Sequence, residues 1–171
     1  MGAWRIRAAW ESDLVVLRDV ERSAGYLFAE AGMDFVAEDE PPTVEELREF
    51  VECGRAWVGV DGENRSVGYL LAGVVDGNAH LEQVSVRPEH MRRGIGRALL
   101  ERLIAWSRER ELPAITLTTY VEVPWNGPYY ERCGFRFLTA EEETPGLRRI
   151  RADEIARGLD RWPRACMRRD I

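Results

Sequence analysis

The sequence contains no lysine, and its 24 basic residues are all arginine. Because a nucleotide-binding P-loop ends in Gly-Lys followed by Ser or Thr, this absence excludes that motif. Cysteine and histidine are scarce too, with three and two residues respectively, scattered without the spacing of metal ligands. We therefore expect reduced thiols and no bound metal.

Long apolar runs are absent as well. No segment approaches the length that spans a membrane, and the first five residues are not followed by the apolar core of a signal peptide. We therefore expect a cytoplasmic protein with no membrane partner. The chain has 171 residues, of which 45% are hydrophobic and 32% charged, which is typical of one globular domain covering residues 1–171.

The charge is unevenly distributed. The net charge of −6 argues against general nucleic-acid binding. Residues 38–52 contain seven carboxylates against one arginine, whereas residues 87–97 contain four arginines against one glutamate. An acidic region combined with a basic turn suits a cationic substrate beside an anionic cofactor. The alternative for the acidic stretch is an ordinary solvated helix face.

The sequence pattern changes twice between residues 80 and 106. Residues 80–87 are rich in valine and other apolar residues, which predicts a strand, and residues 88–93 form a polar turn. From Gly94 onward the apolar residues follow helical spacing. The predicted apolar face of this helix comprises Ile95, Ala98, Leu99, Leu103 and Trp106.

A strand, a glycine turn and a helix start together favour phosphate binding. The first N–H groups of a helix lack partners within it, and the helix dipole is positive there. Gly94 and Gly96 let an anion approach the backbone, and nearby arginines attract it. The alternative is a helix start that simply packs closely on a strand. A dinucleotide motif is excluded, because Leu99 stands where its third glycine is required.

The remaining pattern predicts further alternation of strands and helices. Strands are expected at 4–9, 55–61, 66–75, 114–119, 135–139 and 163–169, and helices at 44–53, 129–133 and 152–159. Ser12 is expected to cap a first helix whose apolar face is Leu14, Leu17 and Val20. Gly25 is expected to break that helix before a loop or short helix over 26–35. This pattern predicts one mixed α/β domain, with 114–119 parallel to 80–87.

Two motifs in this order resemble a known family. Residues 92–97 read Arg-Arg-Gly-Ile-Gly-Arg, and some thirty residues later come Tyr130, Arg132, Gly134 and Phe135. Together they resemble the GNAT superfamily of acyl-CoA-dependent N-acetyltransferases, whose turn motif is Q/R-x-x-G-x-G/A. The resemblance covers residues 55–138, and extends over 1–54 only in order and length. Met91 departs from the motif at its Q/R position, so one polar contact is expected to be weaker.

The resemblance implies a fold and a cofactor. The expected fold is a central mixed, mostly antiparallel sheet, flanked by helices and splayed between the parallel strands 80–87 and 114–119. Acetyl-CoA is the expected cofactor, with its pantetheine paired to the strand around Val84, Ser85 and Val86. Its pyrophosphate is expected on the backbone N–H groups of the turn, namely those of Arg92, Arg93, Gly94, Ile95, Gly96 and Arg97. Asn126 is expected either to bond the pantetheine or to cap the following helix.

Acetyl transfer to an amine requires a neutral amine, a polarised thioester carbonyl and a protonated leaving thiolate. A backbone N–H near Val84 or Val86 can polarise the carbonyl. Tyr130 aligns with the family's tyrosine that donates to the sulfur, and its alternative is a core aromatic. Glu82 is the candidate base, since strand alternation places it on the face of Val84. The alternatives are a Glu82 paired with an arginine, water as the base, or His80, which we expect to be exposed.

These features predict direct transfer in a ternary complex from acetyl-CoA to a primary amine of a small molecule or peptide. Cys133 has no histidine nearby in the sequence, so an acyl-cysteine intermediate is not expected. The alternative function is a non-catalytic acyl-CoA-binding sensor or interaction module. The final strand pairs either within the chain or with a second copy, and the second arrangement gives a homodimer.

Overall fold

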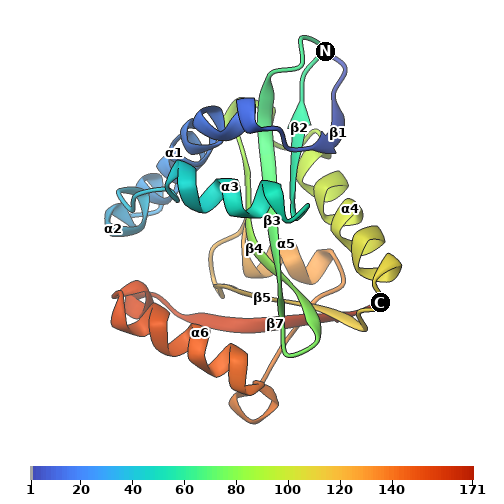
Figure 1. The fold of residues 1–171 in the computed structure, drawn as a ribbon. Helices are drawn as coiled ribbons and strands as arrows, with labels where there is room; N and C mark the ends of the chain where they lie inside the picture. Colours follow the sequence, from blue (N-terminus) through green and yellow to red (C-terminus); the bar gives the residue numbers. More distant parts are fainter. Residues whose placement is uncertain (1) are drawn as a thin grey trace. The chain divides into compact units, whose positions relative to one another are not determined.

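The computed structural model describes residues 2–171 and contains a seven-stranded sheet in the order β1-β2-β3-β4-β5-β7-β6 (Figure 1). The β4–β5 pair is parallel, and the ladders β1–β2, β2–β3, β5–β7 and β6–β7 are antiparallel. The predicted mixed, mostly antiparallel sheet with flanking helices is therefore confirmed. The strands are β1 (Arg5–Ala8), β2 (Ala56–Val60), β3 (Ser66–Val75), β4 (Asn78–Val86), β5 (Ala114–Tyr120), β6 (Arg136–Phe137) and β7 (Arg164–Asp170).

The chain divides into two compact units. The first comprises the residues up to Ala72 together with Glu82–Leu103, and the second comprises Gly73–Leu81 and Ile104–Ile171. The strands β3 and β4 and the helix α4 (Ile95–Glu109) contribute residues to both units. No helix within residues 2–171 is long and apolar enough to cross a membrane.

In the first unit, helices cover both faces of the strands (Figure 1). The helices α1 (Leu14–Glu30) and α3 (Val44–Glu52) bury Leu17 and Leu47 in one core cluster with Tyr69 of β3. On the other face α4 approaches closely, since a Cβ added to Gly59 would lie 2.7 Å from Cγ2 of Ile95. The strand glycine is therefore what lets α4 pack against the sheet.

Two expectations for the first unit were wrong and one was confirmed. The helix predicted at 44–53 is confirmed as α3, and the Thr43 side chain caps it by accepting a hydrogen bond from the N–H of Glu46. In contrast, Ser12 does not cap α1, because a 3₁₀ turn at Glu11–Asp13 precedes the helix and Asp13 occupies the N-cap position. Gly25 does not break α1 either; the short helix α2 (Asp34–Ala37) packs against it, with the carbonyl oxygen of Ala37 3.5 Å from the place of an added Cβ.

In the second unit, the helix α6 (Pro145–Ala156) is joined to β5 and β7 by a buried ion-pair network. Glu154 accepts hydrogen bonds from Thr118 and from the guanidinium groups of Arg151 and Arg164. The expected helix at 152–159 was therefore too short and began too late. The arginine-rich sequence of α6 has little apolar periodicity, because charged side chains make much of the contact between this helix and the sheet.

Candidate active site

The backbone alternates in handedness in the turn between β4 and α4. The angle φ is 62° at Arg92 and 86° at Gly94, and the right-handed helix begins at Ile95. Backbone N–H groups in such alternating conformations converge on one concavity, which forms an anion-binding nest. The free N–H groups of the first helical turn add to it. The turn therefore has the backbone geometry that an oxyanion requires.

The side chains of this turn leave it positively charged. Neither Arg92 nor Arg93 makes an ion pair with a residue in the described part of the chain. Arg97 lies 3.5 Å from Glu101, but both side chains are about two-thirds exposed, so solvent weakens this pair. The nest is thus flanked by guanidinium groups available to an anionic ligand.

Gly94 is required by its backbone conformation. A positive φ is costly for any residue that carries a Cβ, whereas glycine adopts it freely. Space is not the constraint, since an added Cβ would meet only Cζ2 of Trp4, at 3.7 Å. Arg92 adopts a similar angle without this freedom, and such local strain is concentrated at functional sites.

The strand β4 changes from buried to accessible along its length. Its first four residues, 78–81, are buried, Glu82 is exposed, and Gln83, Val84 and Val86 are half-buried. The accessible part leads directly into the turn. Ser85 differs, because it is buried and its hydroxyl accepts a hydrogen bond from Nε2 of Gln83 at 2.8 Å.

Glu82 has the electrostatic environment of a weak base. Desolvation by the surrounding protein raises the pKa of its carboxyl group, and the Arg55 guanidinium opposes this rise. Arg55 does not form an ion pair with it: its guanidinium donates to the carbonyl oxygen of Ala72 and lies over the ring of Phe50. Since the Glu82 side chain also reaches solvent, the rise in its pKa is modest and favours the protonated form only slightly.

His80 is 2% exposed, so the expectation that it lies exposed at the strand entrance was wrong. Its Nδ1 lies 2.8 Å from Oγ1 of Thr116, which is also within hydrogen-bond reach of the carbonyl oxygen of Ala79. The neutral imidazole can form this hydrogen bond in either tautomer, with Nδ1 donating to the hydroxyl or accepting from it. Burial lowers the pKa of His80 to about 4, against a smaller opposing effect of Glu154. The imidazole is therefore neutral near pH 7.

Tyr130 belongs to the second unit, in the helix α5 (Gly127–Arg132). Its ring is 8% exposed and makes edge-to-face contacts with Tyr129 and Phe135. Burial raises the pKa of its phenol well above the ordinary value, so the hydroxyl stays protonated. Within residues 2–171 that hydroxyl makes no hydrogen bond. A protonated donor with no hydrogen-bond partner in residues 2–171 is suited to donate to a ligand.

Asn126 stands at the N-cap position of α5. Its carbonyl oxygen accepts from the N–H of Tyr130 at 3.0 Å, but its side chain makes no capping hydrogen bond. Side-chain capping, one of the two roles predicted for Asn126, is therefore not used. Gly127 follows because a Cβ there would lie 2.7 Å from the carbonyl oxygen of Val121.

Comparison with known proteins identifies the family. The model of the Acetyltransferase (GNAT) family matches residues 24–135, well over half of the chain. The chain belongs to the GNAT acetyltransferase family. It is therefore an acyl-CoA-dependent acyltransferase by family.

Solved GNAT structures share the fold at low sequence identity. A GNAT acetyltransferase from Staphylococcus aureus superposes with a TM-score of 0.76 at 17% identity, covering 98% of this chain and 99% of the other. The PaiA N-acetyltransferase of Thermoplasma acidophilum, solved with coenzyme A, gives 0.71 at 14% identity, covering 99% of each chain. The ribosomal-protein-S18-alanine N-acetyltransferase of Escherichia coli gives 0.68 at 20% identity, covering 99% of this chain and 94% of the other.

The residues that the sequence singled out fall into two groups in this GNAT acetyltransferase. The first unit brings together, on one strand and the turn after it, Glu82, Val84, Ser85, Val86 and residues 92–97. The second unit contains His80, Asn126 and Tyr130. Sequence reasoning missed the hydrogen bond that the Tyr69 hydroxyl donates to Oε2 of Glu21, because the two residues lie 48 positions apart.

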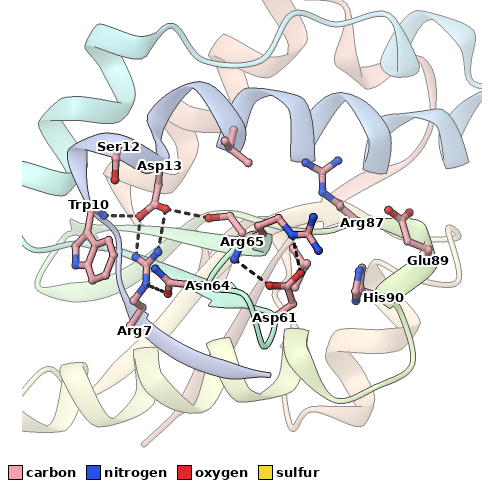
Figure 2. A pocket seen from close by; sticks show the side chains of 13 residues that line it. Arg7, Trp10, Ser12, Asp13, Asp61, Asn64, Arg65, Arg87, Glu89 and His90 are labelled. Atoms are coloured by element: carbon pink, nitrogen blue, oxygen red, sulfur yellow. Dashed lines mark hydrogen bonds and ion pairs between the residues drawn. The ribbon is translucent and has the colours of Figure 1, made fainter. Parts of the chain in front are cut away.

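A polar cavity of about 540 Å³ also lies in the first unit (Figure 2). Figure 2 shows Arg7 between Asp13 and Asn64, and its guanidinium bonds both oxygens of Asp13 at 2.8 and 3.0 Å. Arg65 and Arg87, which also line the cavity, are paired with carboxylates too. None of the predicted site residues lines this cavity, and its arginines are already neutralised. The cavity adjoins the start of the basic turn, because Arg87, Glu89 and His90 line it.

Proposed function

We propose that this protein is an N-acetyltransferase that moves the acetyl group of acetyl-CoA to a primary amine of a small molecule or peptide, by direct transfer in a ternary complex. The observation that carries the proposal is the anion-binding nest at Arg92–Gly94. It is flanked by unpaired arginines and follows directly on the accessible half of β4. Family membership supports acyl-CoA as the ligand.

The first unit supplies the groups to hold the cofactor. The N–H groups of residues 92–97 bind the pyrophosphate, and Arg92, Arg93 and Arg97 balance its charge. The accessible backbone at Val84–Val86 binds the pantetheine arm, in the manner of a strand added to a sheet edge. The relative from T. acidophilum, solved with coenzyme A, supports this ligand class.

Bound acetyl-CoA supplies an activated acetyl thioester. A backbone N–H at Val84 or Val86 donates a hydrogen bond to the thioester oxygen, where negative charge develops. Glu82 takes the proton of the acceptor ammonium, directly or through water. Tyr130 donates its phenolic proton to the departing sulfur. The raised pKa values of Glu82 and Tyr130 fit a proton acceptor poised toward neutral pH and a donor that stays protonated.

A cationic amine is the proposed acceptor class. The acidic segment 38–52 attracts a cation, whereas the basic turn binds the anionic cofactor. The names of two similar proteins point to the two kinds of acceptor in the proposal, a peptide and a small molecule. One is named for an alanine of ribosomal protein S18, and another, an N-acetylglutamate synthase from Neisseria gonorrhoeae, was solved with N-acetyl-glutamate. The chain covers 35% of that second protein.

The Tyr130→Phe variant tests the assignment. Thiol release from acetyl-CoA would be measured with a panel of amines and polyamines, and acetyl-CoA affinity by calorimetry. We expect kcat to fall about 10²-fold with affinity unchanged, because only the donor to the sulfur is lost. Tyr129→Phe, the neighbouring tyrosine in the same helix, is the matched control and should keep wild-type kcat. Equal kcat in Tyr130→Phe and wild type would disprove the acid role.

A further inference from the structure

The helix α1 carries a carboxylate on the side that faces the core. Its buried residues, Leu14, Leu17 and Val20, follow helical spacing. The next position on this side, four residues after Leu17, is Glu21, which is half-buried. No residue of α1 after Val20 is buried. Glu21 therefore marks the point at which α1 leaves the core cluster.

One oxygen of the Glu21 carboxylate is held by a buried tyrosine. The Tyr69 hydroxyl donates to Oε2 of Glu21 at 2.8 Å, and Tyr69 is 0% exposed. The other oxygen, Oε1, makes no hydrogen bond with any residue in 2–171. Desolvation raises the pKa of Glu21, and the nearby charge of Asp39 adds to this rise. The hydrogen bond from Tyr69 and the charge of Arg18 oppose it.

The arginines closest to Glu21 in the sequence pair with another carboxylate. Arg18 and Arg22 both lie beside Glu40, at 3.5 and 3.2 Å. Within the described residues Glu21 itself forms no ion pair. A partly desolvated carboxylate without a paired cation is unfavourable, and perturbed carboxylates are concentrated at functional sites. Glu21 is therefore suited to pair with a cation that arrives as a ligand.

The register of β3 and β4 places this carboxylate on the substrate-accessible strand. The two strands are neighbours joined by a tight turn, so they run antiparallel. The N–H of Arg87 donates to the carbonyl oxygen of Val67 at 2.8 Å, so Tyr69 lies opposite Ser85. Opposite residues share one face of a sheet. Glu21 is thus held on the face of Ser85, in the part of β4 to which the proposed function assigns the pantetheine arm.

We propose that Glu21 binds a second cationic group of the acceptor, one that is not acetylated, and that Tyr69 holds the carboxylate in place for it. This inference rests on the proposed function. The reacting ammonium must lose its proton, whereas a carboxylate paired with it would favour the charged form. A group that stays charged benefits from the pair throughout the reaction. The acceptor is therefore a diamine, or a peptide with a basic group near the reacting amine.

Glu21→Gln removes the charge and keeps the shape, because the amide oxygen still accepts from Tyr69. Steady-state kinetics would compare linear diamines with monoamines of the same length, and a peptide that contains one arginine with its glutamine analogue. We expect wild type to have at least about tenfold lower KM for the dicationic substrate of a pair, the value of one charge-assisted hydrogen bond. Preference within the diamine pairs or within the peptide pair identifies the kind of acceptor.

The variant should abolish this preference selectively. In Glu21→Gln we expect the two KM values of a pair to become equal, with acetyl-CoA affinity and the KM of the monocationic substrate unchanged. The matched control is Glu30→Gln, at an exposed glutamate in the last turn of the same helix, which should keep the preference.

Tyr69 is a positioning residue, because it acts only through Glu21. Tyr69→Phe should reduce the preference for the dication about threefold or more, and should have no further effect in the Glu21→Gln background. Structural damage would change both KM values of a pair together and leave their ratio as it was. An unchanged ratio in Tyr69→Phe would therefore refute the positioning role.

The outcomes distinguish this inference from the function on which it rests. Turnover of amines by wild type without preference for a second cation would overturn the inference alone. A preference that survives in Glu21→Gln would do the same. No turnover of any amine by wild type would overturn the proposed function, and the inference with it.

Discussion

Acidification should destabilise this protein through His80, and the size of the effect follows from its burial. In the unfolded chain the imidazole pKa is 6.5, whereas burial lowers the pKa of His80 to about 4 in the folded protein. Between these two values the unfolded state binds more protons than the folded state. Stability therefore falls as the pH drops from about 7 toward 4.

The linkage relation gives the magnitude. At pH 7 neither state holds much of the proton, and the cost to folding is about 0.2 kcal/mol. At pH 5 the unfolded imidazole is mostly protonated while the folded one is mostly neutral, and the cost is about 2 kcal/mol. His80 alone should therefore remove about 2 kcal/mol of unfolding free energy between pH 7 and pH 5.

Urea unfolding of wild type and His80→Gln at pH 7, 6 and 5 would measure this effect. The substitution removes the titrating imidazole, and both proteins contain the same carboxylates. The titration of the carboxylates therefore cancels when the unfolding free energies of the two proteins are subtracted. We expect wild type to lose about 2 kcal/mol relative to the variant between pH 7 and pH 5. Parallel stability curves across this range would refute the buried, neutral His80.

Three further predictions concern residues of the first unit, namely Gly94, Asp13 and Glu82. Gly94→Val should weaken acetyl-CoA binding at least tenfold, about 1.4 kcal/mol by calorimetry; Gly77→Val, at another positive-φ glycine in open space, should not, and equal losses would refute the nest. Asp13→Ala leaves a buried guanidinium unpaired and should cost about 3–5 kcal/mol in urea unfolding. Glu63→Ala, in an exposed pair, should cost less than about 1 kcal/mol, and a similar loss in both would contradict the burial argument. Glu82→Gln should lower kcat about 10²-fold with acetyl-CoA affinity retained, and unchanged kcat would exclude it as the base.

Local chemistry in the sequence predicted much of the fold correctly. The start of α3, which Thr43 caps by accepting from the N–H of Glu46, depends on neighbouring residues alone, so the sequence carries its signal. The helix start at Ile95 was predicted for the same reason. In each case the residues that decide the conformation lie within four positions of one another.

Features that depend on distant contacts were missed. Gly25 continues α1 because α2 packs against it, a tertiary contact that overrides the low helix propensity of glycine. His80 is buried, and its Nδ1 lies 2.8 Å from Oγ1 of Thr116, a residue 36 positions away in the sequence. A glycine such as Gly94 indicates in the sequence that φ can be positive. An arginine such as Arg92 gives no such indication.

In the candidate site, too, the local features could be predicted from the sequence and the features that depend on distant contacts could not. The motif at residues 92–97 is local, so the sequence alone predicts a phosphate-binding turn there. The hydrogen bond from the Tyr69 hydroxyl to Glu21 joins a strand to a helix, although the two residues are 48 positions apart in the sequence. No periodicity or motif connects them, so only the folded structure could bring them together.

The measurement that tests the central claim most directly is a calorimetric titration with acetyl-CoA, followed in the same samples by thiol release with a panel of amines. The account predicts saturable binding that Gly94→Val weakens, and CoA release that depends on the amine and requires Tyr130. Binding without release from any amine would favour a non-catalytic acyl-CoA sensor. Absence of acetyl-CoA binding would contradict the assignment of the basic turn, and with it the proposed function.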